Sequence, residues 1–184
     1  MRFSPTEVTG CWLLDIEPHT DERGLFARTA CEHEFSDCRL NGHFVQSSIS
    51  VNVRRGTLRG LHLQLPPSAE AKLVRCTRGR IFDVVLDLRT GSSSQHRWQG
   101  FELSSHNHRA LYIPPGCAHG FQTLEDDCDI FYQMTDFYAP DLGFGVRWND
   151  PLFDIKWPLS APTLLERDAN YPDFNPQAFE AYAW

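Results

Sequence analysis

The sequence lacks the segments that direct a chain into a membrane or out of the cell. No apolar run approaches the roughly 18 residues that a membrane-spanning helix needs, and residues 1–18 contain no apolar stretch of signal-peptide length. No glycine-rich phosphate loop is present, so nucleotide binding cannot be inferred from a loop motif. We therefore expect a soluble, cytoplasmic protein.

Paired cysteines and a basic surface are also missing. The cysteines are scattered without a C-x-x-C spacing, which predicts reduced thiols in a chain of this size without a signal peptide. The net charge of −7 argues against a nucleic-acid-binding surface as the main function. A small anionic ligand remains possible, because two local arginines can hold a phosphate on an acidic protein. The cysteines are Cys11, Cys31, Cys38, Cys76, Cys117 and Cys128.

The chain does contain ample material for one hydrophobic core. It has 184 residues, of which 41% are hydrophobic, and it includes 13 Phe, 5 Trp and 5 Tyr. Short strand-like runs follow one another with turn residues between them, which favours an all-β sandwich or barrel. These runs are Leu58–Gln64, Ala71–Cys76, Ile81–Leu88, Trp98–Leu103, Arg109–Ile113, His119–Leu124 and Asp129–Thr135.

Helices are expected to be few and short. Residues Cys31–Leu40 could form one, and Asn175 followed by Pro176 is a suitable start for a second over Gln177–Tyr182. Residues 150–184 are rich in Pro and Asp and are expected to wrap around the domain as a tail. We therefore expect a single domain over residues 1–184.

Strand alternation predicts where several polar side chains point. In a regular strand over Leu58–Gln64, His62 shares a face with Gly60 and Gln64, and Arg59 points the other way. Tyr132 is expected to point inward, on the apolar face of its strand. Asp83 lies in a strand that is apolar on both faces, so its carboxylate needs a partner.

The residues suit proton transfer better than metal binding. Pro114–His119 resembles the second cupin motif, Pro-x-Gly-x-x-His, but His62-Leu63-Gln64 lacks the second histidine of the first motif, and Lys72 adds a cation close by. Three or four metal ligands cannot be assembled from these residues, so we expect no metal. An imidazole titrates near about pH 6.5, which suits His62 as a general base.

Such a base needs a carboxylate on its far nitrogen, and Asp83, Asp168 and Asp173 are the candidates. Lys72 could stabilise an enolate oxygen, and Tyr132 could return a proton from the opposite face. The alternative is that the histidine and the tyrosine are ordinary core residues. Arginines beside turns could hold a phosphate or could be solvated surface charges; they are Arg23, Arg54, Arg55 and Arg59.

Together these residues resemble the dTDP-4-dehydrorhamnose 3,5-epimerase family of sugar-nucleotide epimerases. The matching segments follow the family's order over about residues 1 to 175, and Tyr132 lies among them. They are Asp21–Phe26, Arg54–Gln64, Ala71–Arg89, Leu111–Asp127, Asp136–Asp141, Arg147–Pro151, Ile155–Pro158 and Leu165–Pro172.

The resemblance implies a cupin-type jelly-roll barrel, a homodimer with exchanged N-terminal strands, a dTDP-linked 4-keto sugar as substrate, and no cofactor. It implies His62 as the base, Asp168 as the residue that orients it, Lys72 at the C4 oxygen and Tyr132 as the opposite acid. It also implies that Arg23 and Phe26 bind the substrate across the dimer. The other implied substrate-binding residues are Gln46, Arg59, Asp83, His119 and Tyr138.

The sequence departs from the family pattern at several places, and other activities remain open. Arg28, Leu63 and Cys117 replace residues that are common in the family, and the last two are expected in the pocket wall. One or both of the C3 and C5 centres could be inverted. The alternatives are a cofactor-free keto-sugar isomerase, a sugar-binding cupin without turnover and, least favoured, a metal-dependent oxygenase.

Overall fold

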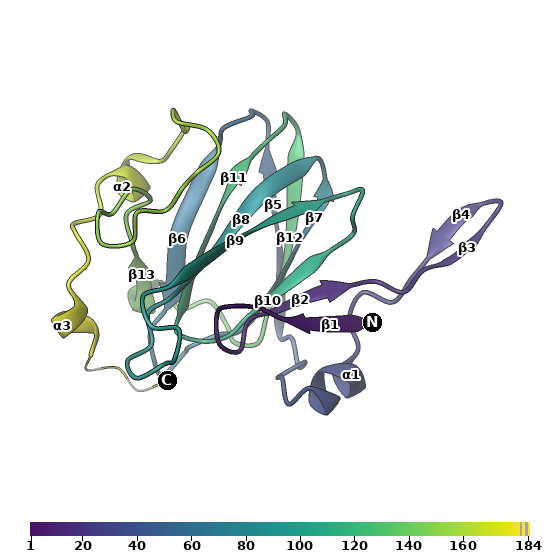
Figure 1. Cartoon of the computed structure of the whole chain (residues 1–184), viewed down its shortest axis with the longest axis horizontal. Coiled ribbons are helices and arrows are strands. Elements are labelled where there is room, and N and C mark those ends of the chain that lie inside the picture. Colours follow the sequence, from purple (N-terminus) through teal and green to yellow (C-terminus); the bar gives the residue numbers. More distant parts are fainter. Residues whose placement is uncertain (181, 183) are drawn as a thin grey trace.

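The protein is a jelly roll of two antiparallel sheets (Figure 1), seen in a computed structural model that describes residues 1–180, 182 and 184. The six-stranded sheet has the order β1 (Arg2–Pro5), β2 (Trp12–Asp15), β10 (Ala110–Ile113), β7 (Lys72–Arg78), β12 (Cys128–Met134), β5 (Gln46–Asn52). The five-stranded sheet has the order β13 (Gly143–Gly145), β6 (Leu58–Gln64), β11 (Cys117–Thr123), β8 (Arg80–Asp87), β9 (Trp98–Ser104). The predicted all-β cupin-type fold is confirmed.

Helical segments are short, as expected. They are α1 (Glu32–Asp37), the 3-10 turn η1 (Pro140–Leu142), α2 (Glu166–Ala169) and α3 (Pro176–Phe179). The helix predicted over Cys31–Leu40 is therefore shorter than expected. The one predicted over Gln177–Tyr182 begins at Pro176, after the Asn175 side chain accepts a hydrogen bond from the Gln177 N–H; Ala181 lies outside the described residues.

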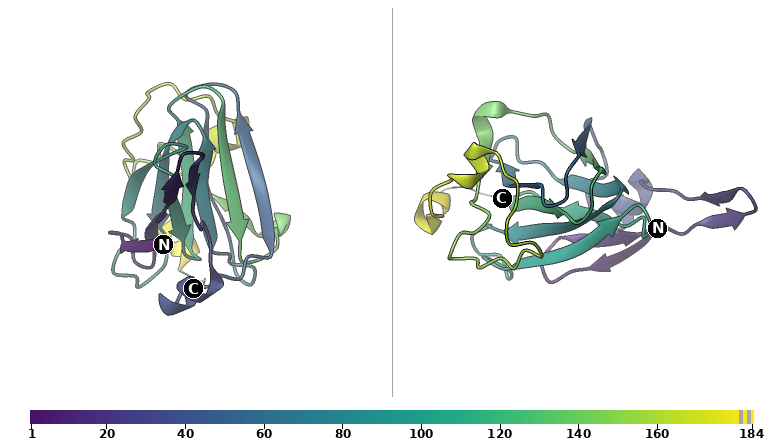
Figure 2. Two further views of the ribbon diagram at one scale, coloured as in Figure 1. Left: turned by 90° about the vertical axis from the view of Figure 1, so that its right-hand side faces the viewer. Right: turned by 90° about the horizontal axis from the view of Figure 1, so that it is seen from above.

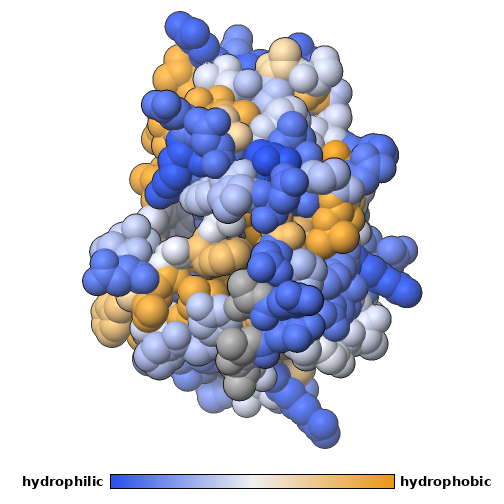
Figure 3. Space-filling model, turned by 90° about the vertical axis from the view of Figure 1, so that its left-hand side faces the viewer, coloured by the Kyte–Doolittle hydropathy of each residue, from blue (hydrophilic) through white to orange (hydrophobic). Residues whose placement is uncertain are grey.

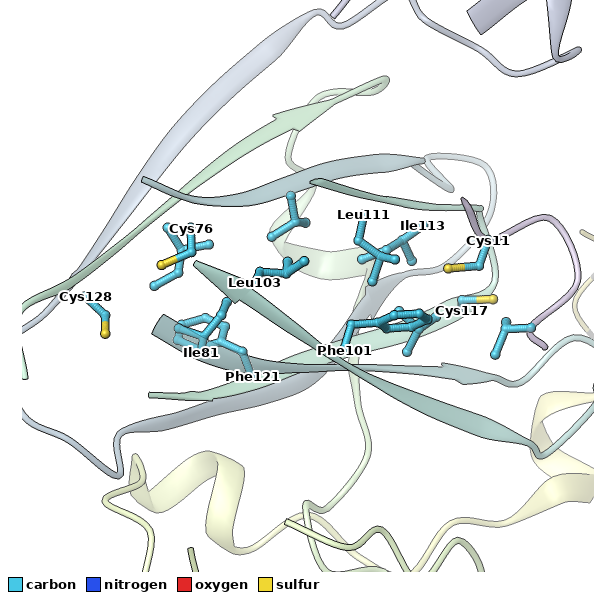
Figure 4. Packing of buried hydrophobic residues seen from close by; sticks show 14 residues of the cluster. Cys11, Cys76, Ile81, Phe101, Leu103, Leu111, Ile113, Cys117, Phe121 and Cys128 are labelled. Carbon is cyan, nitrogen blue, oxygen red and sulfur yellow. The ribbon is translucent and has the colours of Figure 1, made fainter. Parts of the chain in front are cut away.

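The space between the two sheets is filled by apolar side chains over part of its length. Figure 4 shows this cluster, with Cys11 and Cys117 at one end and Cys76 and Cys128 at the other. All four cysteines are buried, so Cys117 belongs to the core and does not lie on the wall of the binding cleft described below. The expectation that it alters the pocket wall is wrong, because its strand turns this side chain toward the packed end of the barrel.

The C-terminal segment covers the outer face of the five-stranded sheet. Phe153, Ile155 and Phe179 pack there against Leu61, Val84 and other side chains of that face. Figure 3 shows this side of the molecule, where hydrophobic residues reach the surface at separate places between hydrophilic ones. This covering also brings α2 to the edge of β6, which positions the residues discussed next.

The N-terminal hairpin extends away from the barrel. Its strands, β3 (His19–Asp21) and β4 (Gly24–Phe26), pair with each other and with no other strand of the described residues, and all of their residues are exposed. Figures 1 and 2 show the hairpin beyond the body of the molecule in two directions of view. The barrel of the same chain therefore does not cover the apolar side chains of the hairpin.

Candidate active site

A cleft opens between the two sheets beyond the packed core. It has a volume of about 640 Å³, and a second hollow of about 500 Å³ adjoins it and shares several lining residues. Residues His62, Lys72 and Tyr132 line both. β6 of one sheet supplies His62, and β7 and β12 of the other supply Lys72 and Tyr132. The fold thus gathers three of the four predicted catalytic side chains from both walls of one cleft.

A bulge in β6 changes the direction of one predicted residue. His62 pairs with His119 of β11, but Arg59 pairs with Phe121, so three residue steps on β6 oppose two on β11. Arg59 and His62 consequently line the same hollow, and the expectation that Arg59 points away is wrong. Gly60 lies at the bulge with φ of +114°, and a Cβ there would lie 2.6 Å from the Cα of Gly120.

Asp168 on α2 pairs with His62 across a sequence separation of more than a hundred residues. Its Oδ1 lies 2.9 Å from Nε2 of His62, and its Oδ2 accepts the Gly60 N–H at 3.2 Å, which the bulge leaves available. With Nε2 committed to the carboxylate, Nδ1 is the ring nitrogen left to act as a base. Of the three candidate carboxylates, Asp168 is the one that meets His62.

The environment of Asp168 favours its charged form. Burial by itself would raise the pKa of this carboxyl, but the hydrogen bond and charge of His62, the Gly60 N–H and Arg167 outweigh burial and lower it. Arg167 donates from Nε to Asp168 Oδ1 at 3.1 Å, and its Nη2 lies 3.3 Å from Nε2 of His62. A carboxylate whose charged form is favoured is what a histidine that must accept a proton requires.

Asp83 pairs with the other histidine of the cleft. Its Oδ2 lies 2.9 Å from Nε2 of His119, and its Oδ1 has no hydrogen-bond partner among the residues that the structure describes. Asp83 is completely buried, and burial raises its pKa despite the charge and hydrogen bond of His119. It lies outside the lining of both hollows, so it can reach a ligand only through His119.

Tyr132 is a partly buried phenol on the wall opposite His62. Its strand neighbours Ile130 and Met134 point the same way, into the core and the cleft, which confirms the predicted inward orientation. Burial raises its pKa well above the usual range, and the charge of Asp83 acts in the same direction. The ring meets that of His119 edge to face at 6.0 Å between centroids. The phenol therefore keeps its proton and can donate it.

The remaining substrate-binding candidates divide into two groups. Gln46 and Tyr138 line the cleft, and Gln46 Oε1 accepts the Tyr138 N–H at 3.0 Å. Leu63 also borders the cleft, but its side chain is buried in the cluster under the C-terminal segment, so its expected effect on the pocket wall stays a prediction. Arg23 and Phe26 lie on the exposed hairpin and line neither cleft hollow of their own chain.

Two further candidates have partners of their own. Asp173, the third carboxylate that could have oriented His62, pairs with Arg147 instead. Arg28 pairs with Glu34 near the N-terminus, at 2.6 Å.

Three residues of the cleft escaped the sequence reasoning. Arg167 and Tyr171 flank Asp168 in the chain and line the cleft, and Tyr171 meets the His62 ring edge to face at 6.2 Å. A Cβ on Gly145 would lie 2.0 Å from the Tyr171 ring, so a glycine there makes this approach possible. The third residue, Glu70, pairs with Lys72. Arg167 and Tyr171 are close to Asp168 in the sequence, and Glu70 is close to Lys72. This proximity was the signal that could have identified them.

Metal ligands do not converge in this cleft. Within residues 1–180, 182 and 184, no group of three or more His, Cys, Asp or Glu side chains is placed to hold a metal ion. The predicted lack of a metal stays a prediction. In the same part of the chain, no helix is long and apolar enough to cross a membrane.

The fold and the cleft define a cupin-type protein with acid–base side chains on both walls. The family model for dTDP-4-dehydrorhamnose 3,5-epimerase matches residues 5–176. The curated enzyme of that name from Methanothermobacter thermautotrophicus is 43% identical over 173 residues, which cover 92% of either chain. The chain belongs to the dTDP-4-dehydrorhamnose 3,5-epimerase family and is an isomerase that acts on carbohydrates.

Solved structures of the family agree with this assignment over nearly the whole chain. The dTDP-4-dehydrorhamnose 3,5-epimerase of Elizabethkingia anophelis superposes with a TM-score of 0.92 at 38% identity, covering 95% of this chain and 96% of that one. The enzyme from Bacillus anthracis, solved with TDP and PPi bound, gives 0.91 at 36% identity and covers 94% and 99%. The family predicted from the sequence segments is confirmed.

Proposed function

We propose that the protein epimerises a dTDP-4-keto-6-deoxyhexose at C3 and C5, converting dTDP-4-dehydro-6-deoxy-D-glucose to dTDP-4-dehydro-L-rhamnose. One observation carries the proposal: the His62–Asp168 pair lies on one wall of the cleft and the Tyr132 phenol on the other. Inversion needs a base on one face of a carbon and an acid on the other. The 4-keto group makes the hydrogens at C3 and C5 acidic enough for this chemistry.

His62 removes the proton. Its Nε2 is held by the Asp168 carboxylate, which orients the ring and stabilises the positive charge that forms on it. The low pKa of Asp168 keeps this carboxylate charged when the ring becomes charged. A positioned general base contributes about 10² to 10⁴-fold to such a step.

Lys72 and Tyr132 complete the reaction. The electron pair left by the proton moves to the C4 oxygen, where the Lys72 ammonium stabilises the enolate; one preorganised donor at such an oxygen is worth about 10² to 10³-fold. Tyr132 then delivers its proton to the opposite face of the carbon, which inverts the centre. Its raised pKa supports the protonated form that this step needs.

The cleft also suits the charge of a sugar nucleotide. Arg59 and Arg167 line the hollow beside His62, and Arg59 is oriented by a hydrogen bond from its Nε to Asn52 Oδ1 at 2.8 Å. Guanidinium groups bind phosphate oxygens in a forked geometry. His119, Gln46 and Tyr138 bind the sugar and its neighbouring groups. The Bacillus anthracis relative was solved with TDP and PPi bound, which supports the binding of a thymidine diphosphate in this part of the cleft.

A second copy of the chain supplies the nucleotide-binding hairpin. Phe26 is 76% exposed on that hairpin, and Ile49, Val51 and Val53 expose an apolar stripe along and just beyond β5. Among the residues that the structure describes, β5 pairs on one side only. An unpaired apolar edge strand is suited to accept a strand from another chain. We expect the hairpin of one protomer to pair there, placing Arg23 and Phe26 beside the partner's cleft.

Mixing two inactive variants tests this exchange. His62→Ala and Arg23→Ala subunits, mixed and allowed to reassemble, should regain about a quarter of wild-type activity, because half of the dimers are mixed and each has one intact site. Sedimentation equilibrium measures the dimer itself. A monomer in solution, or no regain of activity by a demonstrated mixed dimer, would overturn the exchange but not the reaction.

NMR in deuterated water tests the reaction. Purified protein with dTDP-4-keto-6-deoxyglucose and EDTA should place deuterium at C3 and C5 and give an L-configured product. Label at one carbon alone would restrict the activity to that centre, and a carbonyl moved to C3 would indicate the keto-sugar isomerase. Binding without any label would indicate a sugar-binding protein, and activity restored by added metal would contradict the cofactor-free mechanism.

A further inference from the structure

Glu70 and Lys72 form an ion pair at the wall of the cleft. Oε1 of Glu70 lies 3.2 Å from Nζ of Lys72, and both side chains line the cleft. Only 8% of the Glu70 side chain and 14% of the Lys72 side chain are exposed. An ion pair this far from solvent is weakly screened, so its geometry is better defined than that of a surface pair.

Gln64 holds Glu70 from the other side. Its Nε2 lies 3.2 Å from Oε2 of Glu70 and also approaches the carbonyl oxygens of Ser68 and Phe137, both at 3.1 Å. Its Oε1 accepts the Ala139 N–H at 2.6 Å. Gln64 is 4% exposed, so this amide is a fixed part of the wall. The Glu70 carboxylate is thus bound through both of its oxygens.

This arrangement fixes an otherwise mobile group. A lysine ammonium sits on a flexible four-carbon stem and loses conformational entropy when it is immobilised. Glu70 neutralises the ammonium from one side, and the N–H groups that do not face Glu70 remain for a ligand. A ligand that meets Lys72 already in place does not have to order it, which is the advantage of preorganised stabilisation of a developing negative charge.

We propose that Glu70 is a positioning residue for Lys72: it holds the ammonium group where the enolate oxygen forms. The catalytic part of this inference rests on the proposed function, because it assigns a role within that reaction. The positional part rests on the observed ion pair and on the hydrogen bond from Gln64 to Glu70. The two parts are therefore tested by two separate measurements.

The first measurement needs no activity. The chain has only two lysines, Lys72 and Lys156, and Lys156 pairs with Asp154 on the exposed surface. With ¹⁵N-labelled lysine, we expect the Lys72 ammonium to give a resolved signal protected from water exchange, and Glu70→Gln to abolish it. The Lys156 signal, exposed in both proteins, is the internal control. A Lys72 signal that is equally protected in Glu70→Gln would overturn the positioning role.

The second measurement is a double-mutant cycle on turnover. Glu70→Gln preserves the shape of the side chain and a hydrogen bond to Gln64 but removes the charge. We expect kcat to fall about tenfold while KM changes less than about threefold, since the loss concerns the transition state. In a Lys72→Ala background the same substitution should have no further effect on kcat, because Glu70 acts through Lys72.

The outcomes separate the inference from the proposed function. An equal loss of kcat with and without Lys72 would show a general structural role and overturn the inference, as would an unchanged kcat in Glu70→Gln. Wild-type protein that produces no deuterated or inverted sugar would overturn the proposed function instead, and the lysine NMR would then decide the positional part alone. Thermal unfolding of each variant verifies that the fold is retained.

Discussion

The histidines of two histidine–carboxylate pairs are neighbours in the five-stranded sheet, and the surroundings of the two pairs differ. The side chain of His62 is 33% exposed and that of His119 only 6%. Asp168 accepts hydrogen bonds from His62, Gly60 and Arg167, whereas one oxygen of Asp83 has no partner among the described residues. The pKa is lowered in Asp168 and raised in Asp83.

A histidine paired with an aspartate therefore does not define a catalytic role by itself. A carboxylate that stays charged can support a histidine through a change of charge, so the Asp168 pair is suited to accept a proton. A carboxyl group whose charged form is disfavoured by burial is suited to hold a neutral ring in place. Residue types alone leave Asp83, Asp168 and Asp173 as candidates, and the family resemblance favours Asp168. Their hydrogen-bond partners separate them in the structure.

The largest expected difference between the two pairs is the effect on kcat of replacing the carboxylate. Asp168→Asn should lower kcat by about 10²-fold or more, because the amide no longer stabilises the protonated His62. KM should change little, since Asp168 is 1% exposed and its effect is realised through the ring. Steady-state kinetics with the keto sugar nucleotide measures both. A kcat close to that of the wild type would remove the distinction between the pairs.

A smaller effect is expected for the matched change in the second pair. Asp83→Asn should lower kcat roughly tenfold or less, because its carboxyl can reach the substrate only through His119 and the amide can still bond that ring. The same assay gives the ratio of the two effects. If Asp83→Asn is as damaging as Asp168→Asn, the two pairs share the work of the base and the comparison fails.

The two pairs should also respond to acid in opposite directions. An aspartate in the unfolded chain has a pKa of about 3.9. Because the pKa of Asp168 is lowered on folding, its stabilising contribution is complete above that value and disappears as the pH falls through the folded pKa. Because the pKa of Asp83 is raised, its contribution is complete below that value and is lost as the pH rises through the folded pKa.

Urea unfolding of the two variants checks this sign. The free-energy difference between wild type and Asp168→Asn should grow in favour of the wild type as the pH rises from about 3 to about 7. The corresponding difference for Asp83→Asn should change in the opposite sense. Equal slopes for both variants would show that the two carboxyl groups have similar environments.

The smallest effect is expected at the third candidate carboxylate. Asp173 pairs with Arg147 near the surface and lines neither hollow of the cleft. Asp173→Asn should therefore leave kcat and KM within about twofold of the wild type, as for most surface changes. This variant is the control for Asp168→Asn, and a large loss of activity would mean that the tail around Asp173 contributes to the site.

Much of the fold was predictable because its strands alternate regularly and end at turn residues. The predicted strand over Leu58–Gln64 matches β6, and other predicted strands differ from the observed ones by one or two residues at their ends. Regular alternation also predicted the inward direction of Tyr132 and the need of Asp83 for a partner. These inferences depend on local geometry, which the sequence pattern carries.

The rest depends on irregular or distant contacts. The bulge at Gly60 reversed the expected direction of Arg59, and nothing in the alternation of residues marks it. Arg167 and Tyr171 reach His62 because the C-terminal segment folds back over β6, a packing that the local pattern does not contain. The hairpin with Arg23 and Phe26 lines neither hollow of its own chain, so its predicted place in the site of a second chain stays a prediction.

The most direct test of the different roles of the two pairs is deuterium uptake by His62→Ala. The variant would be saturated with dTDP-4-keto-6-deoxyglucose in deuterated water beside wild-type protein and His119→Ala, with binding and folding verified for each. We expect label at C3 and C5 with the wild type, slower label with His119→Ala and none with His62→Ala. Uptake by His62→Ala at the wild-type rate would show that another residue removes the proton and would contradict the assignment of the base.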